Sequence, residues 1–164
     1  MIVISDTSCL SALIRVGELS LLHTLFGTIV IPQKVAEELL RLKAFDIDLT
    51  EFSNANWIVQ KSPEDIPLLQ RLLLQLDEGE AHAITIAVEL SADWLIIDEL
   101  KGRKTAESLS INFIGLAGVL LLAKEEGHLL QIKPLLTRIL NETAFRMSAA
   151  LVKKILLTAG EDSE

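Results

Sequence analysis

Cysteine is almost absent from this chain. Cys9 is the only one among 164 residues, which rules out an internal disulfide and fits a reducing cytoplasm. A lone thiol can also be a nucleophile. Cys9, however, lies where a short apolar run gives way to a helical pattern, so we expect a small buried residue.

Long apolar runs are missing too. The longest one, 115–123 (GLAGVLLLA), is about half of the roughly 20 residues that a membrane-spanning helix needs. No basic start followed by an apolar signal core is present. We therefore expect no membrane partner, no export and a cytoplasmic protein, folded as one unit large enough for a substantial core.

Positive charge is scarce. The chain has 15 Lys and Arg against 23 Asp and Glu, a net charge of −8, whereas nucleic-acid binders usually carry a basic face. Basic residues group at 101–104 (KGRK), 41–43 and 153–154. For any one group alone, a solvated helix surface is the simpler interpretation.

What the sequence does contain is an alternation of short apolar runs and helical patterns. The runs predict five buried strands, at residues 2–5, 28–31, 57–60, 94–97 and 112–114. Apolar residues recur at helical spacing between them, at 10–16, 19–26, 35–42, 67–76, 80–90, 101–109 and 116–125. Apolar strands that alternate with helices form parallel sheets covered on both faces. We therefore expect a three-layer α/β/α sandwich with a mainly parallel sheet.

Two regions depart from this alternation. Residues 44–56 show no clean period and predict a long loop or flap. The end of the chain is helical only, with Ser148 as an expected helix cap. The predicted organisation is an α/β domain over 1–128, a helical extension packed on it over 129–158, and a frayed tail over 159–164.

Acidic residues stand where two of the predicted strands end. Asp6 follows the first strand directly, and Asp98 follows the fourth, with Glu99 beside it. Ligands of open α/β sheets gather beyond the carboxyl ends of the strands, so we expect Asp6 and Asp98 at one edge. Glu38 and Glu80 lie on helices, at or beside the apolar stripe that faces inward.

Each acid also has a purely structural interpretation. Asp6 and Asp98 could cap the helices that follow them. Asp77 and Glu80 have the spacing of a capping box, and Glu38 could be a surface residue. Four carboxylates at one edge would, however, repel one another unless a cation neutralised them.

The chemistry of these side chains points to Mg²⁺ or Mn²⁺, which prefer oxygen ligands. The three histidines are far apart in sequence and belong to no cluster, which argues against zinc. A carboxylate-bound divalent cation suits phosphodiester cleavage, because it activates water and offsets the charge that develops on the phosphate.

Four segments, in this order, carry a resemblance to a known family: ISDTSCLSALI, IPQKVAEEL, LDEGEAHAITIAVEL and WLIIDELKGRKTAE. They resemble the PIN-domain proteins, most closely a prokaryotic branch similar to VapC-type toxins. The segment FRMSAALVKKILLTAGE is similar to the C-terminal helical extension of that branch. The resemblance implies a PIN-like fold and a metal-dependent ribonuclease that is the toxin of a toxin–antitoxin pair. It also implies RNA as substrate, a small antitoxin protein as partner, and a homodimer.

By motif position, the resemblance places the family's catalytic and metal-binding acids on four residues: Asp6, Glu38, Glu80 and Asp98. Three of them would ligate the metal, and Glu80 would hold a second ion or orient the attacking water. Glu99 is an alternative to Asp98, and Thr7 or Ser8 resembles the hydroxyl that accompanies the first aspartate. Lys101 and Arg103, just past the acidic edge, are the expected phosphate contacts.

One departure from the family leaves alternatives open. Related sequences often read Gly-Thr-x-Gly after the last strand, but here the turn is GLAG, so Leu116 removes a hydroxyl near the expected phosphate edge. The second hypothesis is therefore an inactive PIN-like module that binds RNA or a protein. A metal-dependent phosphatase ranks last, because such enzymes usually need a second aspartate where Ser8 stands.

Overall fold

A single parallel sheet forms the centre of the molecule. The computed structural model describes residues 1–161, and its five strands lie in the order β3-β2-β1-β4-β5, with every pair parallel. The strands are β1 (Val3–Ser5), β2 (Ile29–Pro32), β3 (Ile58–Lys61), β4 (Trp94–Ile96) and β5 (Phe113–Ile114). Each agrees with its predicted run to within one residue at either end, so the strand predictions are confirmed.

Helices connect the strands and cover the sheet. They are α1 (Thr7–Arg15), α2 (Ser20–Phe26), α3 (Gln33–Leu40), α4 (Thr50–Ser53), α5 (Ile66–Leu72), α6 (Glu78–Glu89), α7 (Leu100–Ser108), α8 (Leu116–Glu125), α9 (Lys133–Glu142) and α10 (Ala149–Thr158). The stretch expected to be a loop, 44–56, contains α4 and the end of a 3₁₀ helix, η1 (Arg41–Phe45). Helices of one turn are too short to show a period in the sequence.

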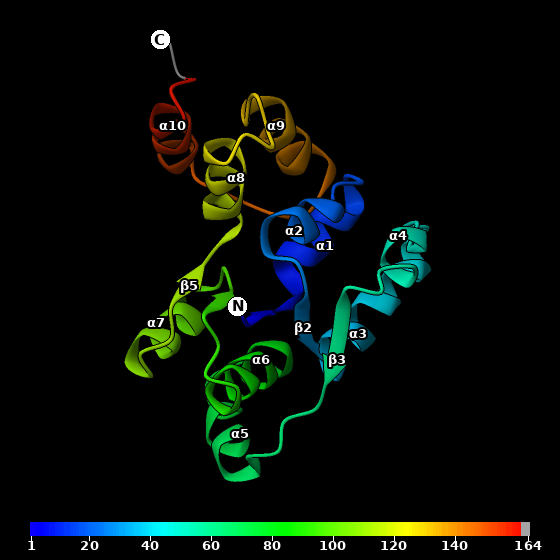
Figure 1. Cartoon of the computed structure of the whole chain (residues 1–164), viewed down its shortest axis with the longest axis vertical. Coiled ribbons are helices and arrows are strands. Elements are labelled where there is room, and N and C mark those ends of the chain that lie inside the picture. The colour runs from blue at the N-terminus through cyan, green and yellow to red at the C-terminus, as the bar shows by residue number, and fades with distance from the viewer. Residues whose placement is uncertain (162–164) are drawn as a thin grey trace.

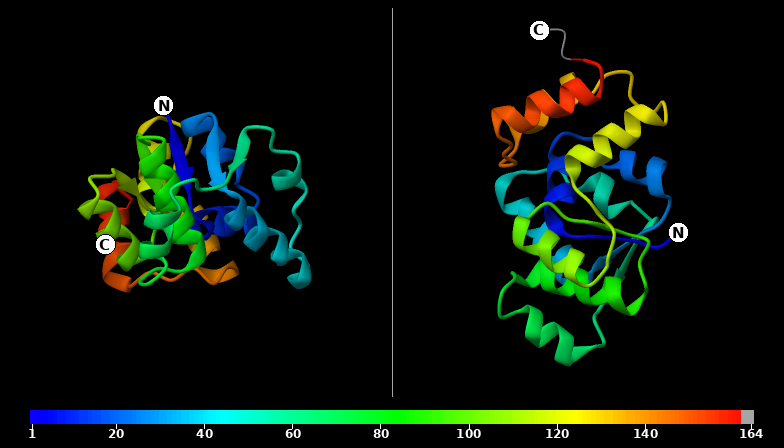
Figure 2. Two further views of the ribbon diagram at one scale, coloured as in Figure 1. Left: turned by 90° about the horizontal axis from the view of Figure 1, so that it is seen from below. Right: turned by 90° about the vertical axis from the view of Figure 1, so that its left-hand side faces the viewer.

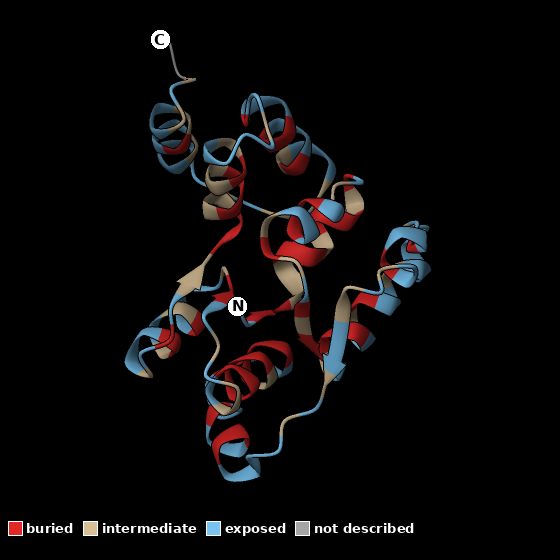
Figure 3. Cartoon of the chain, in the orientation of Figure 1, coloured by how far each residue is buried: buried red, intermediate tan, exposed pale blue. Residues whose placement is uncertain are grey.

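The strands bury both of their faces, because successive side chains point to opposite sides of a sheet. Val3, Ile31 and Ile96 join one apolar cluster with α1, α2 and α8, whereas Ile4 and Leu95 join a second one with α5, α6 and α7. Figures 1 and 2 show these helices on opposite sides of the sheet, and Figure 3 shows burial concentrated between them. The predicted three-layer sandwich is confirmed.

The C-terminal helices pack on the first of these layers. Ile139 of α9 and Ile155 of α10 belong to the same apolar cluster as α1 and α8, and the Arg138 guanidinium donates to the carbonyl oxygen of Val16 (3.0 Å). Ser148 caps α10 by accepting from the backbone N–H of Leu151 (3.1 Å), as predicted. The division into domain and extension remains a prediction.

The beginning of the tail that we expected to fray is held in place. Glu161 accepts hydrogen bonds from the backbone N–H groups of Ile132 and Lys133, just before and at the start of α9, and pairs with Lys124 at 2.9 Å. Its side chain is only 7% exposed. Residues 162–164 lie outside the described residues.

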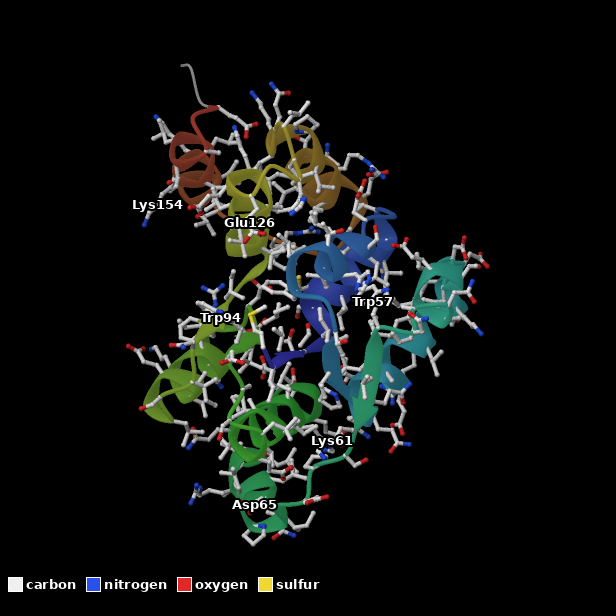
Figure 4. The ribbon with its side chains drawn as sticks, viewed as in Figure 1. Trp57, Lys61, Asp65, Trp94, Glu126 and Lys154 are labelled. Carbon is white, nitrogen blue, oxygen red and sulfur yellow. The ribbon has the colours of Figure 1, made fainter. Side chains whose placement is uncertain are left out.

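The longest apolar run of the sequence is accommodated inside the fold. Helix α8, which contains the longest apolar run, buries Val119, Leu120 and Ala123 in the core. No helix within residues 1–161 is long and apolar enough to cross a membrane. At the edge of the sheet, Trp57, which is labelled in Figure 4, precedes β3. Its ring stacks on that of His23 of α2, with centroids 5.0 Å apart, and so ties the start of β3 to this helix.

Candidate functional site

The strand-end aspartates come together because β1 and β4 are neighbours. Ser5 is in register with Ile96, and the backbone N–H of Asp6 donates to the carbonyl oxygen of Ile96 (3.1 Å). Asp6 and Asp98 therefore leave adjacent parallel strands at the same, carboxyl edge, as the sequence predicts. Asp6 is only 2% exposed. It occupies the N-cap position of α1, but its carboxylate makes no capping hydrogen bond.

Glu38 approaches this edge from α3. The Thr7 hydroxyl donates to Glu38 Oε2, which fixes the carboxylate beside the first turn of α1. A Cβ at position 79 would lie 3.0 Å from the same oxygen and 3.3 Å from the Thr7 hydroxyl. Glycine at position 79 therefore lets the start of α6 lie close against the Glu38 carboxylate.

Glu80 combines a structural role with an unused oxygen. Asp77 Oδ1 accepts from the backbone N–H of Glu80 (2.8 Å), and Glu80 Oε2 accepts from that of Asp77 (3.4 Å), so the predicted capping box is confirmed. Glu80 is nevertheless only 6% exposed, and its Oε1 is buried without a hydrogen-bond partner. Capping alone does not explain that second oxygen.

Asp98 is anchored at the start of α8 and not, as we considered, at the start of α7, the helix that follows it. It does not cap α7, where Glu99 holds the N-cap position without a side-chain bond. Asp98 Oδ1 instead accepts from the backbone N–H of Leu116 at the start of α8 (3.0 Å) and from Arg103 Nη2 (3.3 Å). The Leu116 side chain is fully buried in the core, so its contribution to the site is its backbone N–H.

Arg103 reaches Asp98 across a glycine. A Cβ at position 115 would lie 2.0 Å from Arg103 Nη2 and 2.6 Å from Asp98 Oδ1. The guanidinium also donates through Nε to the carbonyl oxygen of Ile97 (3.2 Å) and lies over the ring of Phe113. Only glycine at this position leaves room for the ion pair.

The carboxylates influence one another electrostatically. Burial raises the pKa of Asp6 well above its ordinary value, and the nearby charges of Asp98, Glu80 and Asp77 raise it further; the backbone N–H of Ser8 offsets a smaller part. Burial also raises the pKa of Glu80 to about 7, helped by Asp77, Glu99 and Glu38. Each mutual effect requires that the acids lie near one another, and we refer to Asp6, Glu38, Glu80 and Asp98 as the acidic cluster.

The pKa of Asp98 responds to a cation as well as to burial. Burial raises it, while the N–H of Leu116 and the charge of Arg103 lower it.

Burial, and then the charges of Asp98 and Asp6, raise the pKa of the fully buried Cys9 thiol. Cys9 is therefore the small buried residue that the sequence predicts, in surroundings that disfavour the thiolate a nucleophile needs.

These side chains suit a hard divalent cation. Three buried side-chain oxygens of the described residues lack a hydrogen-bond partner; Asp6 Oδ1 and Glu80 Oε1 lie in the cluster, and Glu89 Oε2 lies at the other end of α6. Buried unpartnered carboxylate oxygens are costly unless something binds them. Within residues 1–161, no three Asp, Glu, His or Cys side chains are grouped so that together they could hold a metal ion as they stand. The oxygen chemistry fits Mg²⁺ or Mn²⁺, with Arg103 standing as the local cation at Asp98.

A groove of about 630 Å³ opens onto Asp98 and Glu99. Thr7, Ser8 and Arg103 line it; their contact with a substrate stays a prediction. Lys101, the other expected phosphate contact, is exposed on α7 and is not part of the lining. Lys153 and Lys154 are exposed on α10, and Lys154 points away from the rest of the molecule (Figure 4).

Two further arginines line the groove, and the sequence analysis missed both. Arg15 lies at the end of α1, and Arg146 lies in the connection between α9 and α10. Neither belongs to a basic cluster, and 131 positions separate them in sequence. Only the packing of the C-terminal helices on α1 brings them to the same groove, so no local signal could have identified them.

The comparisons with known proteins concern the whole chain. No curated protein matches it. A solved structure, a PilT N-terminus domain protein, SSO1118, from the hyperthermophilic archaeon Sulfolobus solfataricus P2, is 18% identical to it. That match covers 90% of this chain and 100% of the other, with a TM-score of 0.46. A family model described as a PIN domain matches residues 2–161, and this protein therefore belongs to the PIN-domain family.

Proposed function

We propose that this PIN-domain protein is a ribonuclease that cleaves RNA phosphodiester bonds with the help of Mg²⁺ or Mn²⁺. The fold is that of nucleases in general. The observation that carries the proposal is the acidic cluster at the carboxyl edge, where Asp6 Oδ1 and Glu80 Oε1 are buried without a partner. Acids with pKa values perturbed by burial and by neighbouring charges are characteristic of functional sites.

Within the proposal, Asp6, Glu38 and Asp98 hold the cation, and Glu80 holds a second ion or orients the attacking water. When bound, the cation lowers the pKa of a water molecule and offsets charge on the phosphate. Thr7 fixes the Glu38 carboxylate through its hydroxyl. Glu99, exposed at the mouth of the groove, is the alternative to Asp98 as a ligand.

Cleavage of a mixture of single-stranded and structured RNA tests the proposal. We expect wild-type protein to cut RNA only with Mg²⁺ or Mn²⁺, and Asp6→Asn and Asp98→Asn to be inactive while still folded. Glu89→Gln is the matched control, since Glu89 is also on α6 and also has a buried unpartnered oxygen, but at the far end. Equal loss of activity in Glu89→Gln would contradict the assigned site.

The second candidate function is an inactive PIN-like module that binds RNA or a protein. The Arg103–Asp98 ion pair (3.3 Å) favours it, because a guanidinium already neutralises one of the expected ligands. Isothermal titration calorimetry with Mn²⁺ distinguishes the nuclease from the inactive module. Saturable binding that Asp6→Asn abolishes supports the nuclease; no binding together with no cleavage supports the module.

The toxin role extends the proposal to partners. We propose a cytoplasmic toxin that forms a homodimer and is neutralised by a small antitoxin protein. Large apolar side chains remain exposed on this chain, including Phe45 (70%) and Leu74 (83%), and surface of this kind is often covered by a partner. Gel filtration with light scattering checks the dimer, and a monomer at micromolar concentration would contradict it.

A further inference from the structure

The groove beside the acidic cluster has a wall that the α/β sandwich does not supply. Helix α1 forms one side, and Asp98, Glu99 and Arg103 lie at the acidic end. The other side is the connection between α9 and α10, residues 143–147, together with Leu151. The groove has a volume of about 630 Å³, the size of a pocket that holds a small organic ligand.

Arginine is concentrated in this groove, in a chain that is acidic overall. Three of the six arginines of the sequence line it: Arg15, Arg103 and Arg146. Arg103 is occupied by Asp98 and by the carbonyl oxygen of Ile97. The other two have donors to spare. The Arg15 guanidinium has no hydrogen bond or ion pair to any residue within 1–161. Arg146 uses only Nη1, which donates to the carbonyl oxygens of Thr143 and Phe145 (both 3.2 Å).

Apolar side chains lie between these charges. Phe145 and Met147 line the groove from the α9–α10 connection and are partly buried against the core. Leu100 (63% exposed) and Leu151 (41% exposed) also present apolar surface to the groove. Guanidinium forks bind phosphates, and aromatic or apolar side chains stack against unpaired bases. Bases inside a duplex are already stacked and offer no face, so this combination selects a single strand.

We infer that this groove binds single-stranded RNA, with Arg15 and Arg146 contacting its phosphates and Phe145 stacking against a base. The α9–α10 connection thereby completes the substrate site and takes part in choosing the substrate. The inference rests on the proposed function for the nature of the substrate. It differs from that proposal in its residues, none of which belongs to the acidic cluster.

Binding of a labelled single-stranded RNA, measured by fluorescence anisotropy in EDTA, tests the inference without any cleavage. Arg15→Ala and Arg146→Ala should each weaken binding and lower the slope of log affinity against log salt by about 0.7. Phe145→Ala should weaken binding between about fivefold and a hundredfold. Arg71→Ala, an exposed arginine of α5 outside the groove, is the matched control and should bind as wild type does.

Folding and charge are separated by additional variants. Arg146 bonds to the carbonyl oxygens of its own connection, so Arg146→Ala could disturb that connection. Arg146→Lys keeps the charge but not the guanidinium fork, so it should bind RNA more weakly than wild type and more tightly than Arg146→Ala. Arg15→Ala tests a different element. A duplex of the same sequence should bind more weakly. Binding by Arg15→Ala and Arg146→Ala equal to that of Arg71→Ala, or equal affinity for the duplex, overturns the inference.

The two proposals fail differently. If wild-type protein cleaves RNA and the groove variants bind it normally, the nuclease stands and the groove inference is overturned. If no cleavage occurs with any metal but RNA binding depends on Arg15 and Arg146, the groove inference is supported and the nuclease is contradicted.

Discussion

Helices α1 and α6 begin in the same way and use their first aspartate for opposite purposes. Asp6 (φ −84°, ψ −170°) and Asp77 (φ −69°, ψ 171°) both hold the N-cap position in extended backbone. Asp77 is exposed, and its carboxylate caps α6 by accepting a hydrogen bond from the backbone N–H of Glu80. Asp6 is buried, makes no capping bond, and keeps an oxygen without a partner.

The contrast comes from what precedes each helix. Asp77 follows a surface turn, so its carboxylate stays in water and is free to cap. Asp6 follows the central strand directly, so its carboxylate emerges between neighbouring strands and faces other acids. A cap stabilises the fold, whereas a buried acid with a raised pKa costs stability until a cation arrives. The two aspartates should therefore respond oppositely to mutation.

The largest expected effect is on activity, at α1. Asp6→Asn should reduce RNA cleavage on the order of a hundredfold or more, since even residues that only support metal ligands cost 10–100-fold when lost. In metal-free buffer the variant should be at least as stable as wild type, because it removes a buried charge. Cleavage rates and thermal unfolding in EDTA measure both. A variant that is inactive and also much less stable would make Asp6 a structural residue like Asp77.

A smaller loss of activity is expected from Gly79→Ala, which affects the cluster through the start of α6. The new Cβ would meet Glu38 Oε2 at 3.0 Å and displace that carboxylate. Cleavage should fall about tenfold, while stability stays level or rises by up to about 1 kcal/mol, since alanine favours helix over glycine. Full activity in this variant would show that Glu38 does not need its present position.

The third effect is a pH dependence that belongs to the cluster. The pKa of Glu80 is raised from 4.5 to about 7, so the folded state holds this proton more tightly than the unfolded chain. The corresponding stability is fully present below pH 4.5 or so and is lost as the pH rises through about 7.

Glu80→Gln removes this titration. In EDTA, the Tm of Glu80→Gln minus that of wild type should therefore increase from pH 5 to pH 8. The increase should be roughly 2–4 °C for each kcal/mol of unfolding free energy that wild type loses. Adding Mn²⁺ at pH 8 should raise the wild-type Tm and leave Glu80→Gln less affected. A constant gap between the two proteins across this pH range would contradict the raised pKa.

The smallest effect isolates the structural aspartate. Asp77→Ala should cost about 1 kcal/mol through loss of the cap, or 2–4 °C in Tm, and leave cleavage within a few-fold of wild type. Asp77→Asn retains a capping side chain and should be close to wild type in Tm. If Asp77→Ala abolished cleavage in a folded protein, the proposed distinction between the two helix starts would be wrong.

Much of the fold could be predicted because its signals are local. Each strand is a short apolar run, and a strand such as 94–97 shows this whatever its neighbours do. The 3₁₀ helix and α4 were missed since one turn carries no period. Helix α1 begins at Thr7 rather than at Leu10, because polar residues in its first turn hide its start.

In the candidate site, too, features with a local sequence signal could be predicted, whereas features that depend on packing could not. Asp6 and Asp98 could be placed at one edge because parallel strands end together. The ion pair of Arg103 with Asp98 and the approach of Glu38 to Gly79 could not be predicted, since they depend on how helices meet in space. Arg15 and Arg146 are the extreme case, because the last helices must pack before they share a groove.

The strand order has a consequence for the life of the protein before it is complete. β1 is made first, yet it lies at the centre of the sheet and pairs with β4, about ninety residues later in the chain. Asp98, the Leu116 N–H that anchors it, and the α9–α10 connection are synthesised later still. Since domains emerge from the ribosome N-terminus first, a nascent chain cannot assemble this edge until most of it has been translated. If the protein is the ribonuclease that we propose, it cannot cut RNA while it is still being synthesised.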